Sequence, residues 1–330
     1  MVNMVACGNL TIDDVVSANE QVAANQCGGN GLYAALGMWL WGESVGLVAG
    51  VGTDYPHEWL DQLSDKGINL DGVYAVPEEH ALRSRVFYRP DGTRTDRLAE
   101  VELPESARAV VDMTSDFSAM GSAEHLRAWP LYSPTARQVP TQWRSAAGFH
   151  LAPGPHEHLR GLAEMLRHRS ARVLLTLDWP WWNESETGFA TELISQVSAV
   201  LPGAEELERW PIAGSPAATL EALLEICPLA IVKRGSQGSD VYDGGNFTSV
   251  GVSKTTVVDP TGAGDSYCGG FLVGLARTGD PVKAAMYGAV SASIVVQSFG
   301  ALSVLDTDLR EPERRLAELV RTTRAEGAIA

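Results

Sequence analysis

Short apolar runs and segments with helical spacing alternate along the N-terminal part of the chain. The runs at residues 4–7 and 44–51 are β-like and stop at glycine, whereas residues 32–40 and 57–66 carry apolar side chains at the spacing of one helix face. Strand followed by helix, repeated, is the pattern of a parallel sheet with helices on its faces. These residues therefore predict a doubly wound α/β fold with a mostly parallel sheet.

The same rhythm returns after residue 145. Strands are predicted at 148–151, 172–177, 198–201, 229–233 and 256–258, a hairpin at 239–242 and 247–252, and helices at 155–168, 261–278, 281–298 and beyond 311. Residues 102–145 lack a clear period, so no element is predicted there. We find no internal repeat, which favours one α/β domain over residues 1–330.

Residues 73–97 interrupt the rhythm with adjacent strands that have no helix between them. These strands are predicted at 73–76, 81–88 and 93–97. Residues 90–92, Pro-Asp-Gly, carry a hairpin signal between the last two. The pattern predicts a small antiparallel β lid attached to the main sheet, with a contribution from residues near 9–20.

The composition narrows the choice of partners. The net charge of −16 gives a surface that repels nucleic-acid phosphates and anionic membranes, so neither is expected as a partner. An apolar run of membrane-spanning length and the layout of a signal peptide are both missing from the sequence, so a cytoplasmic protein is expected. The four scattered cysteines form no CxxC pair, which argues against a disulfide framework or a zinc site.

The most informative stretch is residues 259–265, Asp-Pro-Thr-Gly-Ala-Gly-Asp, at the start of a predicted helix. Gly262 and Gly264 let the backbone turn tightly and approach a ligand closely. The first turn of a helix has unpaired N–H groups and the positive end of the dipole. The amides of Gly262, Ala263 and Gly264 can therefore cradle a phosphoryl group, within reach of the Asp265 carboxylate.

Phosphoryl transfer needs in-line positioning, neutralised phosphate oxygens and an acceptor for the hydroxyl proton, and this motif supplies two of the three. The positive helix end favours ionised Asp265, which predicts a weak base. In the alternative interpretation the aspartate only stabilises the start of the helix. The sequence has neither a GxxxxGK[ST] motif nor a GxGxxG after its first strand, which disfavours P-loop kinases and dinucleotide-binding folds.

With this motif in place, the chain resembles the PfkB-type carbohydrate kinases, the ribokinase-like family. Residues 259–265 are similar to the family's second signature. Residues 28–35, Gly-Gly-Asn-Gly-Leu-Tyr-Ala-Ala, and 50–54, Gly-Val-Gly-Thr-Asp, resemble its first signature. Residues 7–13 are similar to the family's first strand and its substrate-binding aspartate. These segments occur in the family's order and span nearly the whole chain.

The resemblance implies roles for individual residues. Asp265 would be the catalytic base and Gly262, Ala263 and Gly264 the anion hole. The resemblance also implies that sugar hydroxyls are bound by Asp13, Gly28, Gly29 and Asn30. The nucleotide would be bound by Lys233, Gly235, Gly238 and Gly300. A monovalent cation such as K⁺ would be bound by Asp259 and Thr261. The lid would close over the substrate and exclude water, and a homodimer through the lid is also implied.

Three positions depart from the family's pattern. Glu206 matches the glutamate of an N-x-x-E motif associated with Mg²⁺, but Gly203 replaces the asparagine. Tyr33 replaces an asparagine of the first signature. Lys233 replaces a common threonine, where it either contacts a phosphate or is a solvated strand end. Mg²⁺ is still expected, because ATP arrives with it.

Several arginines crowd the lid of an otherwise acidic protein. They are Arg83, Arg85, Arg89, Arg94 and Arg97. Alternate strand positions share a face, so Arg83 and Arg85 point the same way. Arg85 is a candidate for an anionic group of the substrate. Alternatively, exposed strand arginines discourage edge-to-edge pairing.

The sequence thus predicts an ATP-dependent kinase that phosphorylates a hydroxyl of a sugar or sugar acid. A sugar acid would need an arginine that faces the cleft. A nucleoside kinase, which would need an apolar pocket beneath the lid, is the first alternative. A non-catalytic sugar or nucleotide sensor is the alternative from a different class.

Overall fold

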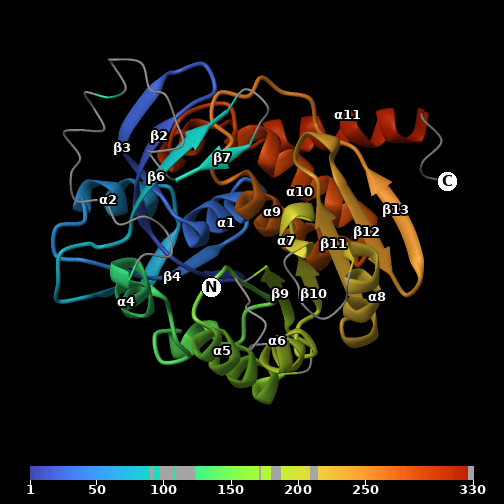
Figure 1. Ribbon diagram of the computed structural model, residues 1–330, viewed down its shortest axis with the longest axis horizontal. Coiled ribbons are helices and arrows are strands. Elements are labelled where there is room, and N and C mark those ends of the chain that lie inside the picture. Colours follow the sequence, from blue (N-terminus) through green and yellow to red (C-terminus); the bar gives the residue numbers. More distant parts are fainter. Residues whose placement is uncertain are drawn as a thin grey trace.

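The computed structural model describes residues 1–89, 93–96, 108, 123–170, 172–179, 187–208 and 215–325. These residues form a nine-stranded sheet of order β13-β12-β11-β10-β9-β8-β1-β4-β5 with helices on both faces, and a separate four-stranded sheet of order β3-β2-β6-β7 (Figure 1). The doubly wound α/β prediction is therefore confirmed.

The main sheet is parallel except for a hairpin at one edge. Its strands are β1 (Met4–Cys7), β4 (Val45–Val51), β5 (Asn69–Ala75), β8 (Gly148–Leu151), β9 (Leu174–Asp178), β10 (Ala199–Leu201), β11 (Leu229–Lys233), β12 (Ser239–Asp243) and β13 (Asn246–Val250). The central strands are continuous apolar runs because helices cover both of their faces. Strand order reverses between β1 and β8, so a ligand is expected at the carboxyl ends of these strands.

Two groups of helices cover the sheet (Figure 1). One face carries α1 (Asn30–Trp39), α9 (Ala263–Thr278) and α10 (Pro281–Val295), and the other carries α5 (His156–Arg169), α6 (Thr187–Ile194) and α8 (Pro216–Ile226). The remaining helices are α2 (His57–Asp65), α4 (Ala123–Tyr132), α7 (Ala204–Leu207) and α11 (Glu311–Ala325), with 3₁₀ turns η2 (Thr141–Trp143), η4 (Gly235–Gln237) and η5 (Ala301–Asp306). Within the described residues, we find no helix long and apolar enough to span a bilayer.

Glycines let α1 and α9 approach each other at backbone distance. A Cβ atom on Gly37 of α1 would lie 2.2 Å from the carbonyl oxygen of Ser266, and one on Gly269 of α9 would lie 2.0 Å from that of Ala34. Any side chain at these positions would push the helices apart. The close contact fixes the start of α9, which carries the aspartate-glycine motif, relative to the start of α1.

The lid consists of β2 (Thr11–Val16), β3 (Val22–Gly28), β6 (Arg83–Tyr88) and β7 (Arg94–Thr95). The predicted lid strand at 73–76 was wrong, because these residues lie in and next to β5, which pairs with β4 at the edge of the main sheet. The lid is also mixed rather than antiparallel, since β2 and β6 run parallel. The predicted turn at 90–92 and Arg97 lie outside the described residues.

The strands and helices predicted for the C-terminal half are confirmed only in part. The hairpin of β12 and β13 and the helices α9, α10 and α11 are confirmed. The strand predicted at 256–258 was wrong: Val257 is 57% exposed, and the amides of Val258 and Asp259 both donate to the carbonyl of Val296. The sequence did not predict helices α4, α6 and α8.

Candidate active site

The start of α9 has the backbone geometry that a phosphoryl cradle requires. Gly262 precedes the helix with φ +75°, and a Cβ atom there would lie 2.2 Å from the ring of Tyr33. Among the described residues the amides of Gly262 and Gly264 have no protein acceptor, whereas that of Ala263 donates to the carbonyl of Pro260 at 3.2 Å. Two of the three predicted anion-hole amides are therefore available to a ligand.

Asp265, in the first turn of α9, faces charged groups from four other elements. Burial, together with the charges of Asp178 and Glu206, raises the pKa of its carboxyl to about 7, against the opposing charges of Lys233 and Arg94. The sequence argument, in which the helix dipole favours the ionised form, was wrong because desolvation dominates. A carboxyl with a pKa near neutrality is better suited to accept a hydroxyl proton.

Lys233 lies beneath the motif instead of at a solvated strand end. Its Nζ is 2.6 Å from Asp178 Oδ1, and the two side chains are 14% and 7% exposed. A Cβ atom placed on Gly264 would be 3.6 Å from this Nζ. The ammonium therefore lies next to the proposed phosphoryl cradle. The pairing of Asp178 with Lys233 could not be found from sequence spacing, since β9 and β11 come near each other, on either side of β10, only in the folded sheet.

Glu206 is held next to Lys233 by the main chain. The amide of Gly203 donates to Glu206 Oε2 at 2.6 Å, and Gly203 itself bridges to Lys233 at the end of β11. Burial raises the pKa of Glu206, while the charge of Lys233 lowers it. Since this contact uses only the backbone at position 203, the replacement of asparagine by glycine leaves the orientation of Glu206 intact.

Asp13 provides an unpaired acceptor on the lid side of the site. It is 3% exposed, and its Oδ1 has no hydrogen-bond partner. Burial raises the pKa of this carboxyl to about 7, against the opposing effect of the hydroxyls of Thr11 and Ser84. A Cβ atom on Gly28 would lie 1.8 Å from Asp13 Oδ2, so only glycine fits there. A buried oxygen without a partner is costly unless a ligand hydroxyl satisfies it.

Gly29 and Asn30 join the lid to the main sheet. Gly29 has φ +114°, and a Cβ atom there would lie 2.3 Å from the carbonyl oxygen of Asn9. Asn30 Oδ1 accepts from the amide of Asn9 at 2.7 Å, and its Nδ2 donates to the carbonyl of Pro153 at 2.9 Å. The side chain predicted to bind sugar thus also braces the connections that follow β1 and β8.

Arg85 lies on the other face of the lid from Asp13. Its Nη2 is 3.7 Å from Asp14 Oδ2, and Asp14 and Arg85 are register partners on β2 and β6. Successive strand residues point to opposite faces, so Asp13 and Arg85 are separated by the sheet. The structure does not bring Arg85 together with the other predicted sugar-binding residues.

Tyr88 and Arg94 connect the lid to the α9 motif. Tyr88 Oη is 3.0 Å from Thr261 Oγ1, and Tyr88 and Arg94 are register partners on β6 and β7. Desolvation lowers the pKa of Arg94, but Tyr88, Asp265 and Glu206 together raise it above its usual value. Among the described lid arginines, the structure therefore brings Arg94 toward Asp265.

The predicted nucleotide loop is built on glycines with positive φ. Gly235 (+53°) and Gly238 (+88°) bound η4, and a Cβ atom on Gly238 would lie 2.1 Å from the carbonyl oxygen of Val250. Gly300 has φ +71° and lies against the side chain of Gln26 on lid strand β3. Gly300, which the sequence predicts to bind the nucleotide, is thus in contact with the lid, although the two are distant in sequence.

Asp259 is suited to hold a cation. It is 1% exposed, its Oδ1 accepts from the amide of Thr261 at 2.9 Å, and its Oδ2 has no partner. Burial raises the pKa of Asp259, so the carboxylate is held at a cost that a bound cation would offset. The residues predicted to bind a monovalent cation fit that ion. The carboxylate of Glu206 and its neighbours suit hydrated Mg²⁺.

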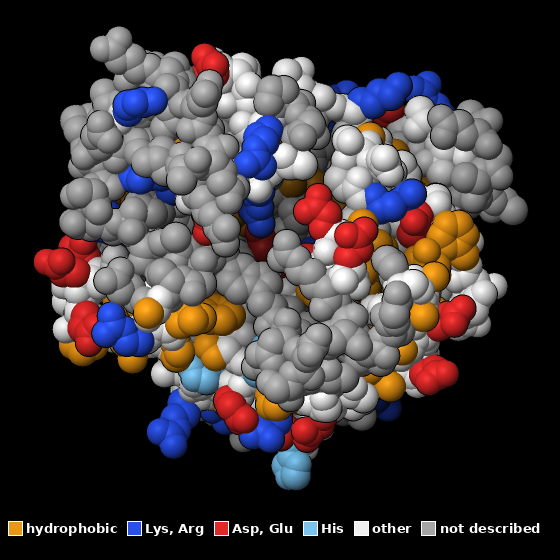
Figure 2. All heavy atoms as spheres, in the orientation of Figure 1, with side chains coloured by type: hydrophobic (Ala, Val, Ile, Leu, Met, Phe, Trp, Pro, Cys, Tyr) orange, Lys and Arg blue, Asp and Glu red, His pale blue; other side chains and the backbone are white. Residues whose placement is uncertain are grey.

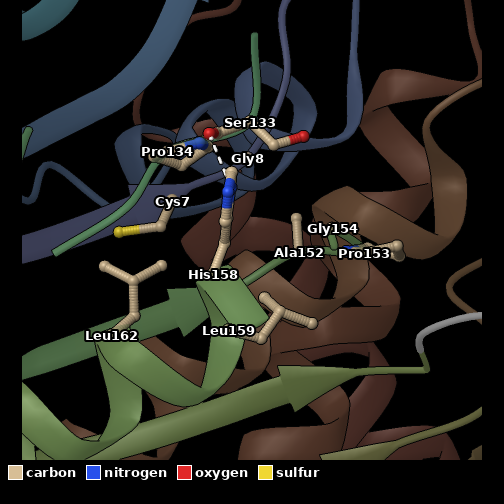
Figure 3. Close-up of a pocket in the computed structure, with 10 residues that line it drawn as sticks. All are labelled: Cys7, Gly8, Ser133, Pro134, Ala152, Pro153, Gly154, His158, Leu159 and Leu162. Atoms are coloured by element: carbon tan, nitrogen blue, oxygen red, sulfur yellow. Dashed lines mark hydrogen bonds between the residues drawn. The ribbon is translucent and has the colours of Figure 1, made fainter. Parts of the chain in front are cut away.

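The surface around these residues is hollowed. Figure 2 shows a depression between β7 and α7, where Lys or Arg and Asp or Glu side chains gather. A separate small cavity lies between β1, β8 and α5, where Cys7, Ala152, Leu159 and Leu162 line it and His158 Nδ1 is 3.1 Å from the carbonyl oxygen of Ser133 (Figure 3). None of the predicted site residues lines this second cavity.

A mostly parallel sheet with a glycine-flanked helix start and a buried aspartate at its carboxyl edge is compatible with a phosphotransferase that acts on hydroxyl acceptors. Residues 6–308 match the pfkB family of carbohydrate kinases, and the chain belongs to this family. Its members and the named relatives are kinases.

Two curated relatives differ in their named substrates. A cytidine kinase from Thermococcus kodakarensis is 27% identical over 309 residues, which cover 92% of this chain and 99% of that protein. A 5-dehydro-2-deoxygluconokinase from Bacillus subtilis is 28% identical over 170 residues, which cover 49% of this chain and 52% of that protein.

Solved structures share the fold over nearly the whole chain. A nucleoside kinase of the ribokinase family from Methanocaldococcus jannaschii superposes with a TM-score of 0.68 at 22% identity, covering 96% of this chain and 99% of that one. A putative ribokinase II from E. coli, in complex with ATP and Mg²⁺, gives a TM-score of 0.69 at 16% identity, with 96% and 100% coverage.

Proposed function

We propose that the protein transfers the γ-phosphoryl group of ATP to a hydroxyl of a sugar or sugar acid, with Asp265 as the catalytic base. The observation that carries this proposal is the convergence of Asp265, the free amides of Gly262 and Gly264, and the Lys233 ammonium at one helix start. Phosphoryl transfer depends mainly on positioning and charge neutralisation, which this arrangement supplies.

The mechanism follows from these positions. The acceptor molecule would be held through its other hydroxyls by Asp13 and the backbone of Gly28 and Gly29, and its reacting hydroxyl would donate a hydrogen bond to the Asp265 carboxylate. The γ-phosphoryl group rests on the amides of Gly262 and Gly264. Because the transition state is loose, Asp265 accepts the proton late and a moderate pKa is sufficient.

The nucleotide and metal sites complete the proposal. The bound ATP would be lined by Lys233, Gly235, Gly238 and Gly300. Glu206 would contact Mg²⁺ through water. When bound, Mg²⁺ supplies charge neutralisation across the phosphates. A monovalent cation such as K⁺ would pair with Asp259 Oδ2 next to Thr261, which stiffens the loop that presents the anion-hole amides.

A nucleoside acceptor is the second candidate, and two observations favour it. The lid face that carries Asp13 also carries Val15, Val86 and Tyr88, which form an apolar cluster with Phe299, whereas Arg85 lies on the opposite face. The match to the cytidine kinase covers nearly the whole chain, while the match to the sugar-acid kinase covers half. An apolar surface beneath the lid suits a nucleobase better than a carboxylate.

The test is ATP consumption with a panel of nucleosides, neutral sugars and sugar acids. Asp265→Asn should lower kcat by roughly 100-fold or more, since general-base catalysis contributes that much. The control is Asp65→Asn on the exposed side of α2, which should turn over like the wild type. Equal turnover by the Asp265 variant would remove the base from its role, and no turnover with any acceptor would favour a sensor.

A further inference from the structure

A buried polar cluster lies directly behind the phosphoryl cradle, and the motif itself does not account for it. His150 of β8, Asp178 of β9 and Cys268 of α9 bring their ligand atoms within 4.8 Å of one another. The ammonium of Lys233 from β11 lies among them, 2.6 Å from Asp178 Oδ1 and 3.5 Å from Cys268 Sγ. Within the cluster, Asp178 and Cys268 favour the positive charge of Lys233.

Asp178 is the anion that balances this lysine. Its Oδ1 also accepts from the amide of Trp179 at 2.8 Å, which fixes the carboxylate at the end of β9. His150 is fully buried, and burial and the charge of Lys233 lower its pKa, to about 4, although Asp178 opposes them, so the imidazole is neutral. A buried ammonium without an anion at this distance would move toward solvent or lose its proton.

The lysine points toward the reacting groups. Its Nζ would lie 3.6 Å from a Cβ atom on Gly264, a residue whose amide is free for a phosphoryl oxygen. Desolvation lowers the pKa of Lys233, but Asp178, Cys268 and Glu206 raise it well above the usual value, so the cation is retained. The charged and titratable groups that face this region are Arg94 of β7, His150 of β8, Asp178 of β9, Glu206 of α7, and Asp265, Tyr267 and Cys268 of α9.

We propose that Asp178 is a positioning residue that holds the Lys233 ammonium beneath Gly264, where it provides a fixed cation for the transferred phosphoryl group. The proposal rests on the proposed kinase function and adds a third source of charge neutralisation to the backbone amides and Mg²⁺. A lysine held by a fixed carboxylate needs no rearrangement when negative charge shifts during transfer. Because Asp178 acts through Lys233, the two residues form one functional unit.

The test is a double-mutant cycle with Asp178→Asn and Lys233→Met on the full chain. Loss of a charge-assisted contact to phosphate should lower kcat by roughly 10- to 100-fold in either single variant. The double variant should be no worse than Lys233→Met alone, since residues that act as a unit are not additive. Multiplicative losses, or Asp178→Asn with wild-type kcat, would overturn the proposal.

The pH profile provides a second readout that a merely structural role would not move. Lys233→Met removes a cation next to Asp265 and should shift the acidic limb of kcat/KM to higher pH. Asp178→Asn removes an anion and should shift the same limb to lower pH. Shifts in the same direction, or no shift in either variant, would contradict the pairing.

Controls separate folding from function. Asp178→Glu keeps the charge and should recover part of the activity that Asp178→Asn loses, which tests the ion pair even where the asparagine variant folds poorly. Glu43→Gln breaks a comparable ion pair, with Arg277 at 2.9 Å, remote from the site, and should leave kcat unchanged. Turnover by the wild type with loss in Asp265→Asn establishes the kinase function independently, so failure of this cycle would refute only the role of Asp178.

Discussion

Gly262 has a backbone conformation that both starts helix α9 and shapes the candidate site. Its φ of +75° and the ring of Tyr33 at 2.2 Å from a Cβ atom exclude any side chain. The glycine lets Tyr33 pack under the start of α9, and this packing sets the direction of the free amides. Tyr33 replaces the asparagine usual in the family, so the ring takes part in shaping the cradle in this chain.

Gly262→Ala should therefore lose both stability and activity. Strain at positive φ and the clash with Tyr33 should together cost about 1–3 kcal/mol of the free energy of unfolding, and kcat should fall because the amides turn away from the phosphoryl group. Chemical denaturation and ATP turnover measure the two effects.

The matched control is Gly161→Ala in α5, where a Cβ atom would have no neighbour within 4 Å. Alanine in a helix interior is favoured over glycine by about 1 kcal/mol, so this variant should be more stable than the wild type. If Gly262→Ala matched the control in stability and turnover, Gly262 would have no special role.

The site residues that could be predicted from the sequence are those that lie next to one another in the chain. Asp265 and the glycines of residues 259–265 stand in one motif, and their position at a helix start follows from helix geometry alone. Asp178 and Lys233, 55 residues apart, come together only through the pairing of β9, β10 and β11. The burial of Asp265 likewise depends on tertiary neighbours. For this reason the sequence did not predict that the pKa of Asp265 is raised.

The lid is the element in which sequence and structure differ most. The sequence places a lid strand at 73–76 because three short β-like runs follow one another without a helix. In the structure the first run pairs with β4 at the edge of the main sheet. The lid contains β2, which lies within the predicted contribution of residues near 9–20, and β3, which was not predicted. The β3 sequence Val-Ala-Ala-Asn-Gln-Cys-Gly has no alternation of apolar and polar residues, so no pattern indicates a strand there.

Tyr88 is the lid residue that contacts the α9 motif, through Thr261 Oγ1 at 3.0 Å. Tyr88→Phe removes this contact and the hydroxyl that faces Arg94. We expect KM for the acceptor to rise by about 3- to 10-fold, the value of one neutral hydrogen bond, and ATP hydrolysis without acceptor to increase because closure is less complete. Steady-state kinetics with and without acceptor measure both.

Tyr74→Phe is the control, since its Oη donates to the carbonyl of Leu131 on the main sheet side, away from the motif. It should leave both rates unchanged. A Tyr88→Phe enzyme with wild-type KM and no added hydrolysis would show that the lid closes without this contact.

At the scale of the whole molecule, the strand order explains why the site lies where it does. The chain leaves β1 toward β4 and β5, then returns to add β8 to β11 on the other side, so the carboxyl ends next to this reversal are open to a ligand. Continuous apolar strands and βα alternation are visible in the sequence, and they are sufficient to predict this architecture. Helices α4, α6 and α8 were not predicted from the sequence and emerge only in the folded structure.

The buried carboxyl of Asp13 should make the stability of the whole molecule depend on pH. Burial raises the pKa of Asp13 from 3.8 to about 7, so folding takes up a proton over this range. The stability associated with protonated Asp13 is present at pH 4 and is lost as pH rises to about 7. Asp13→Asn removes the dependence, so without ligand it should raise Tm relative to the wild type at pH 8 by a few degrees and less at pH 5.

Thermal unfolding at the two pH values tests this prediction. Asp65→Asn on the exposed side of α2 serves as the control for loss of one negative charge from an acidic protein. If the gain in Tm from Asp13→Asn were the same at both pH values, the carboxyl would not be protonated on folding. The variant should also bind acceptor more weakly, a trade of function for stability.

The backbone contact between α1 and α9 has a consequence for how this chain adapts to different acceptors. In the proposed function, α1 begins at the residues that would hold the acceptor and α9 begins at the amides that would hold the phosphoryl group. Gly37 and Gly269 bring these two helices into backbone contact. The packing of these helices would therefore fix the distance between the acceptor and the phosphoryl group. A bulkier acceptor has to be accommodated by the lid, which makes lid residues the natural place to evolve or engineer a new specificity.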